Sequence, residues 1–382
     1  MELAVILKPG HLFAVAGISI SVFLAGIFWF RPWAGKRADR FLAAVFACTA
    51  VSLTWFLATP GFLLETLPHL SRLSFPALLV MAPMFLFYVR SLTEPGFRLK
   101  TRDLTHFAPV AVFTALFAPF YLSTGEYKAA FNASTPAPAY IHFLDEYTWY
   151  AILVFVLIYF IAILGIISRH RRRIRETFSE VSHIKLSWIS RMILISTLCW
   201  CMIIVVSLSD VSGGRLTYID TNPGLIFGFL LFIGYKVLTQ PSIYSEAGPV
   251  EPDAPETRRD PGTSGEKVRE YERILKERME ADRLYTDPEL TLPALAERLG
   301  IPRNALSGII NSSTGDNFYT FVNTYRVEEV KRLLLRPDKR NLTLLALAMD
   351  AGFNSKATFN AVFKAVTRMT PTQYKASVEK PG

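Results

Sequence analysis

Apolar residues gather in long runs over the first two thirds of the chain. Several runs have about the length of a helix that crosses a bilayer, ~20 residues, and hold few charges. Aromatic residues lie near the ends of these runs, as interfacial side chains do in membrane helices. The pattern predicts seven transmembrane helices: His11 to Phe30, Phe41 to Ala58, Phe75 to Val89, Leu104 to Leu122, Tyr147 to Ile167, Trp188 to Leu208 and Pro223 to Leu238.

The pattern changes after Thr239. Proline, glycine and charged residues fill the stretch up to Gly265, which cannot build a core and is predicted to be a flexible linker. From Glu266 to Arg283 apolar residues return at helical spacing among charged ones. We expect this amphipathic helix to open a second domain. The predicted division is a membrane domain over 1–238, a linker over 239–265 and a C-terminal domain over 266–382.

A pattern of small and apolar residues occurs twice in the C-terminal domain. Ala296 and Gly300 of the first copy return as Ala348 and Gly352, 52 residues later. Each copy is typical of a helix-turn-helix unit, because alanine lets two helices cross closely and glycine takes a positive φ at little cost. The predicted elements are a first unit over about 291–312, a linker helix over 317–335 and a second unit over about 343–365.

The second helix of each unit is predicted to be amphipathic. It begins at Arg303 in the first unit and at Lys356 in the second, where the turn is about one residue longer. Its apolar face is expected to close the core of the unit, which leaves the opposite face in solvent. The residues expected to face inward are Leu306, Ile309, Ile310, Phe359, Val362 and Phe363.

Further short sequences run through this domain: Leu284-Tyr-Thr-Asp-Pro-Glu-Leu-Thr-Leu292, Asn317-Phe318, Val322-Asn323, Tyr325-Arg326-Val327, Ala351-Gly-Phe-Asn-Ser355, Thr358-Phe359-Asn360, Phe363-Lys364 and Thr370-Pro371 followed by Tyr374. Together they make residues from about 266 to 376 resemble the DNA-binding domain of AraC/XylS-type bacterial transcription regulators. The resemblance implies that the second helix of each unit enters the major groove, with both grooves on one face of the duplex.

Polar residues on and beside these two helices are therefore the expected DNA contacts. Ser355 is also a good N-cap, and Asn354 beside it is expected to touch a phosphate. Arg326 matches a family position in the linker helix, where either a structural ion pair or a phosphate contact is expected. The predicted DNA-binding residues are Arg303, Asn304, Ser307, Asn311, Asn354, Ser355, Lys356, Thr358, Asn360 and Lys364.

The sequence departs from the family pattern at three positions. Arg368 stands where the family usually has glycine before Met-Thr-Pro. Gly308 and Ala361 occupy outward positions that often carry long polar side chains. We therefore expect fewer contacts to base edges here, and a larger share for DNA shape and phosphate contacts.

Basic residues gather in every second connection between the apolar runs. By the positive-inside rule these connections lie in the cytoplasm, which puts the N-terminus outside and the C-terminal domain inside a bacterial inner membrane, as a multi-pass protein. The alternate connections carry Arg72, Lys128 and Arg215. The basic connections carry Arg31, Lys36, Arg37, Arg40; Arg90, Arg98, Lys100, Arg102; and Arg169, Arg171, Arg172, Arg173, Arg175, Lys185.

The remaining chemistry in the sequence is sparse. No two histidines are spaced for metal binding, and the three cysteines lie inside apolar runs, so we expect no metal, no cofactor and no catalytic residue. The longest outer connection, Ser123 to Glu146, could shape a ligand site together with the last outer connection. The candidate ligand or sensor residues are Tyr127, His142, Asp145 and Asp210.

The sequence therefore predicts an all-α protein, with a seven-helix transmembrane bundle followed by a cytoplasmic domain of two helix-turn-helix units. We expect no enzyme but a one-component regulator that couples a membrane or periplasmic signal to transcription. The alternatives left open are an integral membrane enzyme or transporter with a regulatory DNA-binding arm, and a bundle that only anchors. The expected partners are double-stranded DNA, the lipid bilayer, RNA polymerase, an unknown small-molecule or protein signal, and a second copy of the chain.

Overall fold

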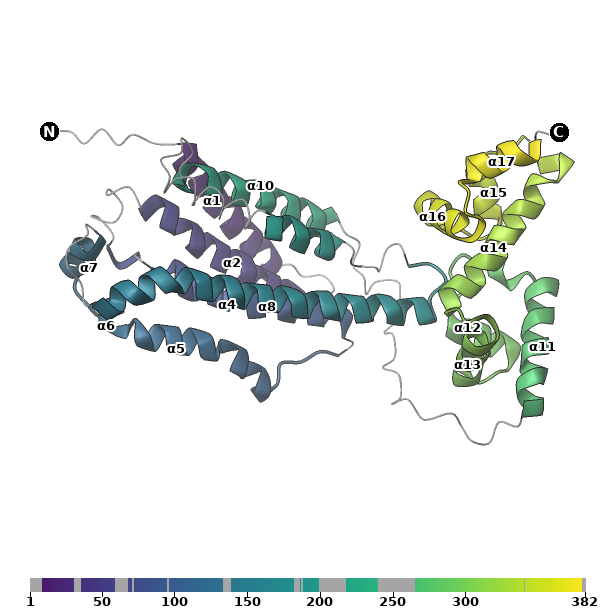
Figure 1. Ribbon diagram of the computed structural model, residues 1–382, viewed down its shortest axis with the longest axis horizontal. Helices are drawn as coiled ribbons and strands as arrows, with labels where there is room; N and C mark the ends of the chain where they lie inside the picture. The colour runs from purple at the N-terminus through teal and green to yellow at the C-terminus, as the bar shows by residue number, and fades with distance from the viewer. Residues whose placement is uncertain are drawn as a thin grey trace. The chain divides into compact units, whose positions relative to one another are not determined.

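The computed structural model describes residues 9–30, 36–58, 68–70, 72–94, 96–132, 139–181, 186, 188–198, 218–239, 265–339 and 341–379. The chain divides into two compact units (Figure 1). One unit is Met1–Ile167 with Leu186–Pro252, and the other is Ser168–Lys185 with Asp253–Gly382. The described regular structure is helical, as the sequence predicts, apart from one isolated antiparallel bridge between Phe178 and Thr291.

Long apolar helices form the N-terminal unit. Helix α2 packs against α1 and α4, and α10 packs against α1; Figure 1 shows these helices running alongside one another. Phenylalanine rings fill the space between them, among them Phe28 and Phe46 at a centroid distance of 5.8 Å. The bounds are α1 Pro9–Phe30, α2 Lys36–Ala58, α4 Ser74–Thr93, α8 Ala139–Thr177 and α10 Tyr218–Thr239.

Four of the described helices are long and apolar enough to cross a membrane, so the predicted set of seven is not shown. Two shorter apolar helices overlap the sixth and seventh predicted spans: Trp188–Leu198 lies in the sixth, and Asn222–Tyr235 begins one residue before the seventh. Residues 199–208 of the sixth span lie outside the described part of the chain. The four candidates are Pro9–Phe30, Ala38–Leu57, Pro68–Thr93 and Tyr147–Thr177.

The fourth predicted span, Leu104 to Leu122, is not one helix. It is divided into η2 Thr101–Phe107, α5 Ala108–Leu116 and α6 Ala118–Tyr121. Pro119 explains the second break, because it has no N–H for the helical bond and its ring crowds the carbonyl four residues earlier. The run still follows α4 from end to end, since the His106 ring lies 5.5 Å from Phe87 and the Tyr121 hydroxyl donates to the Arg72 carbonyl.

The C-terminal unit has two small cores joined by one helix. Helix α14 supplies Phe318 and Val322 to the core of the first helix-turn-helix unit and Val327 and Val330 to the core of the second. Figure 1 shows α14 running between them. The helices are α11 Gly265–Ala281, η3 Leu284–Thr286, α12 Leu292–Leu299, α13 Arg303–Thr314, α14 Phe318–Leu334, η4 Pro337–Lys339, α15 Leu344–Asp350, α16 Lys356–Thr367 and α17 Pro371–Glu379.

The two predicted glycine turns are confirmed, but their surroundings differ. Gly300 caps α12 with φ +65° and has open space where a Cβ would stand. Gly352 has φ +98°, and a Cβ there would lie 2.6 Å from the Tyr285 carbonyl oxygen. Only the second turn therefore needs glycine for close packing as well as for backbone conformation. Arg368 ends α16 in the left-handed conformation, at φ 62°, where the family usually has glycine.

Candidate nucleic-acid interface

The outward face of α13 has the pattern predicted from the sequence. Leu306, Ile309 and Ile310 are buried, while Arg303 and Ser307 are half-buried. The exposed residues of this face are Asn304, Gly308 and Asn311. Pro302 stands at the N-cap of α13 and makes no side-chain cap bond to its first turn.

Helix α16 presents a more basic face. Lys356, Asn360 and Lys364 are exposed at one-turn spacing, which places two cations and one amide along a single line of the helix. Ala361 is exposed among them, so the predicted scarcity of long side chains on this face holds in the structure. A surface of this kind suits phosphate contacts and few base contacts.

Three of the predicted DNA-binding residues lie before or in the first turn of α16, and each makes a hydrogen bond inside the C-terminal unit. Ser355 is the N-cap, and its hydroxyl accepts from the Thr358 N–H at 3.1 Å. Asn354 is exposed and lies 3.5 Å from the Pro288 carbonyl. Thr358 is only 4% exposed, and its hydroxyl bonds to Ser355 and Glu180. The Thr358 side chain therefore lies inside the unit, and not on the exposed face of α16 where the sequence predicts DNA contacts.

Arg326 lies at the centre of the C-terminal unit, where its guanidinium bonds to two backbone carbonyls and to the side chains of Ser179 and Asn323. It is fully buried, and burial lowers the pKa of its guanidinium to about 10. Its Nε donates to the Tyr285 carbonyl at 2.7 Å and its Nη2 to the Asp287 carbonyl at 2.7 Å. A buried guanidinium is stable only when its donors are paired, and these bonds fix η3 and the following turn against α14.

A short segment after α8, residues Thr177–Val181, is bound to the same centre; we call it the docking segment. The Ser179 hydroxyl donates to the Leu290 carbonyl at 2.7 Å and accepts from Arg326 at 3.0 Å. The Ser179 carbonyl accepts from the Asn323 amide at 2.8 Å. Ser179 and Val181 are both fully buried. The docking segment is therefore packed into the C-terminal unit and is not a solvated connection.

The docking segment contacts both helix-turn-helix units and the helix between them. Phe178 pairs in an antiparallel bridge with Thr291, which is the N-cap of α12. Glu180 accepts from the Thr358 hydroxyl at 3.2 Å, in the first turn of α16. Two residues before the segment, in the last turn of α8, the Arg175 guanidinium lies 5.8 Å from the centre of the Tyr319 ring on α14. The predicted domain division placed these residues with the membrane domain, whereas the structure groups Ser168–Lys185 with the C-terminal unit.

Sequence reasoning missed this contact because its local signal is weak. The basic run that precedes the docking segment is sufficiently explained by membrane topology. Asn323 and Arg326 are spaced three residues apart on one helix face, which is a signal that they share a partner. Nothing in the sequence says that this partner is the backbone of a segment more than a hundred residues earlier.

The predicted sensor residues are not brought together by the described part of the chain. Tyr127 lies on α7, Gly125–Asn132, and packs at the edge of the N-terminal core. His142 and Asp145 lie in the first turns of α8, where side chains are not described. Asp210 lies outside the described residues. These four residues therefore remain a prediction from the sequence.

Comparison with known proteins supports the assignment of the C-terminal residues to a helix-turn-helix domain. A family model described as a helix-turn-helix domain matches residues 295–377. An uncharacterised HTH-type transcriptional regulator of Staphylococcus aureus strain COL is 36% identical over 92 residues, which cover 24% of this chain and 12% of that protein. A regulator of the same description from strain MW2 matches equally. No solved structure matches.

The C-terminal part of the chain is an AraC-type helix-turn-helix domain. The N-terminal region holds several long apolar helices of the kind that cross membranes. The chain spans only about an eighth of the length of the curated relatives that it matches, as the 12% coverage shows.

Proposed function

We propose that the protein is a membrane-embedded transcription regulator that binds DNA through α13 and α16. Its orientation follows the basic connections, with the N-terminus outside and the C-terminal domain in the bacterial cytoplasm. The proposed contacts are Arg303, Asn304, Ser307, Asn311, Asn354, Lys356, Asn360 and Lys364, with Ser355 as the cap of α16. The exposed basic and amide line on α16 supports this role.

The observation that carries the proposed coupling is the docking segment. Helix α8 runs without interruption from Ala139 to Thr177, and the docking segment begins at its last residue. A rotation or shift of α8 in the bilayer is therefore transmitted directly to Ser179 and Glu180. Ser179 bonds to Leu290, just before α12, and to Arg326 of α14, and Glu180 bonds to Thr358 of α16. The shift therefore changes the relative placement of the two helices proposed to bind DNA.

The free energy available at this contact matches what a regulatory switch requires. A buried hydrogen bond contributes about 0.5–1.5 kcal/mol net, and one to a charged group about 1.5–3 kcal/mol. Typical allosteric coupling amounts to about 1–3 kcal/mol, or roughly 5–150-fold in affinity. Loss or gain of the Ser179 bonds alone is therefore enough to change DNA binding by a regulatory factor.

DNA binding is tested by selecting genomic fragments with the full chain in lipid nanodiscs and sequencing them, at stated salt. We expect a bipartite site with half-sites about one helical turn apart, as two helices on one face of a duplex require. Asn304→Ala with Lys356→Ala should abolish the enrichment. The matched controls Asn341→Ala and Lys276→Ala, at exposed positions outside α13 and α16, should not. Enrichment that survives the first pair would sink the proposed interface.

Coupling is tested with a reporter driven by the selected site. Ser179→Ala removes two hydroxyl bonds from the docking segment and should shift basal output about fivefold or more. The control Arg172→Ala removes an exposed ion pair with Glu176 on the same helix and should leave output unchanged. If both variants behave as the wild type, the bundle is a passive anchor and the coupling proposal is wrong.

A further inference from the structure

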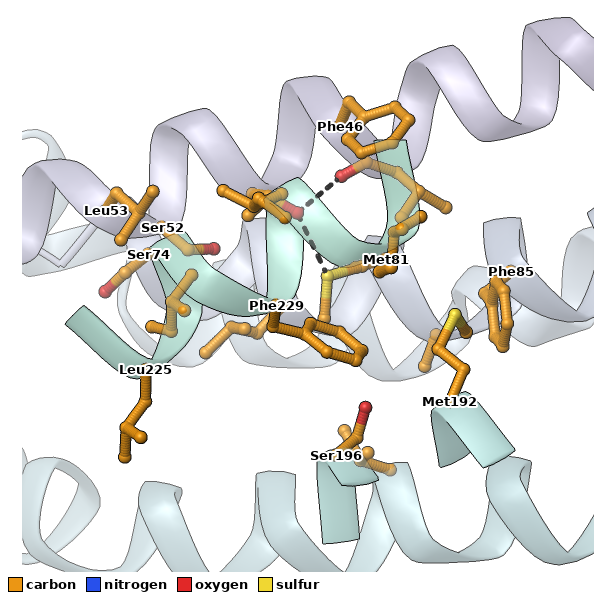
Figure 2. A pocket seen from close by; sticks show the side chains of 18 of the residues that line it. Phe46, Ser52, Leu53, Ser74, Met81, Phe85, Met192, Ser196, Leu225 and Phe229 are labelled. Atoms are coloured by element: carbon orange, nitrogen blue, oxygen red, sulfur yellow. Dashed lines mark hydrogen bonds between the residues drawn. The ribbon is translucent and has the colours of Figure 1, made fainter. Parts of the chain in front are cut away.

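An apolar cavity of about 200 Å³ lies inside the N-terminal unit. It is lined by α2, α4, α8, α10 and the helix Trp188–Leu198. Figure 2 shows Phe46, Leu53, Met81 and Phe229 around it, with Ser74 and Leu225 toward one end. The lining residues include no charged side chain. A space of this size and lining holds a small organic molecule rather than a cluster of water molecules.

Three polar groups of the lining have no hydrogen-bond partner among the described residues. They are the Asn222 carboxamide, through both its nitrogen and its oxygen, the Ser74 hydroxyl and the Trp188 indole N–H. All three side chains are more than nine-tenths buried. The hydroxyls of Thr49 and Ser52 differ, because they bond to carbonyls of their own helix.

Unpaired polar groups in an apolar interior are costly, so a molecule that enters the cavity and bonds to them gains free energy by doing so. A carboxamide offers two donors and one acceptor oxygen and therefore recognises a neutral group that can both donate and accept. A charged head group is disfavoured, because none of the described residues that line the cavity would balance its charge.

We infer that the cavity binds an uncharged medium-chain lipophile with a hydroxyl or comparable head group, held by Asn222 and Ser74. An apolar cavity of about 150 Å³ accommodates benzene, with its six carbons. The cavity of about 200 Å³ is a third larger and therefore suits a chain of about eight carbons. Such molecules partition into the bilayer and reach the bundle from the side.

This inference rests on the proposed function and names the class of its signal. Trp149, Val156 and Tyr159 of α8 line the cavity, and α8 leads into the docking segment. An occupant that separates α8 from its neighbours would therefore act on the element that carries the signal to the C-terminal unit.

The test uses the full chain in nanodiscs of phosphatidylethanolamine and phosphatidylglycerol, with an octanol that carries a photoreactive diazirine. Cross-linked peptides are mapped by mass spectrometry, and the label is competed with 1-octanol, octanoate and n-octane. We expect saturable labelling of the helices that line the cavity. Unlabelled octanol should displace it more effectively than octanoate or octane do.

Variants separate a specific site from simple partition into lipid. Asn222→Leu should weaken binding about tenfold, as expected for one buried hydrogen bond. Ala82→Leu adds bulk to the lining and should abolish labelling without removing a polar group. Ser74→Ala should weaken binding, whereas the control Ser19→Ala, on an exposed face of α1, should not.

Two outcomes would overturn the inference. One is label confined to the exposed face of the bundle, and the other is cavity labelling that neither Asn222→Leu nor Ala82→Leu reduces. DNA selection with the same nanodisc sample distinguishes this failure from failure of the proposed function. If a bipartite site is still selected, the regulator assignment stands and only the ligand assignment is wrong.

Discussion

Alanine at the two repeated glycines is expected to have unequal effects, although the sequence makes the positions equivalent. Gly300 and Gly352 each end the first helix of a helix-turn-helix unit with positive φ. An L-residue in that conformation costs about 1–2 kcal/mol. Gly300→Ala should cost only this amount, because no atom lies within 4 Å of the added Cβ.

Gly352→Ala should cost clearly more. Its Cβ would stand 2.6 Å from the Tyr285 carbonyl oxygen and 2.9 Å from the Thr286 Cα, and both are backbone atoms that a side-chain rotation cannot move. Overpacking of this kind costs about 1–3 kcal/mol beyond the strain, so the total is about 2–5 kcal/mol. The Tyr285 carbonyl also accepts from Arg326, so relief of the overlap would disturb the central bonds.

The measurement is pulse proteolysis of the full chain in nanodiscs over a urea series, with loss of a C-terminal tag as the signal. This signal reports unfolding of the C-terminal unit separately from the bundle, and the midpoint converts to free energy through the denaturant slope. Gly300→Ala is the matched control. Equal midpoints for the two variants, or a lower midpoint for Gly300→Ala, would refute the packing argument.

Three further predictions follow from single residues. Arg368→Gly should raise the free energy of unfolding by about 1 kcal/mol, because it removes an L-residue from the left-handed C-cap of α16. An unchanged urea midpoint would show that the backbone at Arg368 is not strained. Arg326→Lys should lower the free energy of unfolding by about 2–4 kcal/mol, because one ammonium cannot satisfy the carbonyls and the hydroxyl to which the guanidinium donates. An unchanged urea midpoint would contradict the central role of Arg326. Lys356→Ala should reduce the salt slope of DNA binding by about one, measured by titration at several salt concentrations, and an unaltered slope would exclude a phosphate contact.

Much of the C-terminal fold can be predicted from the sequence, because local residue patterns determine its helices and turns. Apolar spacing correctly assigned the buried faces of α13 and α16, and the helix starts at Arg303 and Lys356 are confirmed. Ser355 acts as the predicted cap. These features depend on helical periodicity and on bonds within a single turn, which neighbouring residues decide among themselves.

The membrane-type region was only partly predictable. Apolar length identifies α1, α2, α4 and α8 as candidate spans, because the bilayer thickness sets the length of a crossing helix. The same rule overlooked the break at Pro119, since a count of apolar residues ignores a missing backbone donor. The cavity could not be read from the pattern at all, because its lining comes from helices that are distant in the sequence.

The partners of the buried polar residues depend on how the chain packs in three dimensions. The sequence marks Arg326 as a polar residue in the linker helix, but its bonds to the Tyr285 carbonyl and to Ser179 require segments that the fold brings together. Likewise it makes Gly300 and Gly352 equivalent, whereas only Gly352 faces another backbone. Periodicity determines which face of a helix is buried. The packed chain determines which segment covers that face, as Ser179 of the docking segment covers Arg326 on α14.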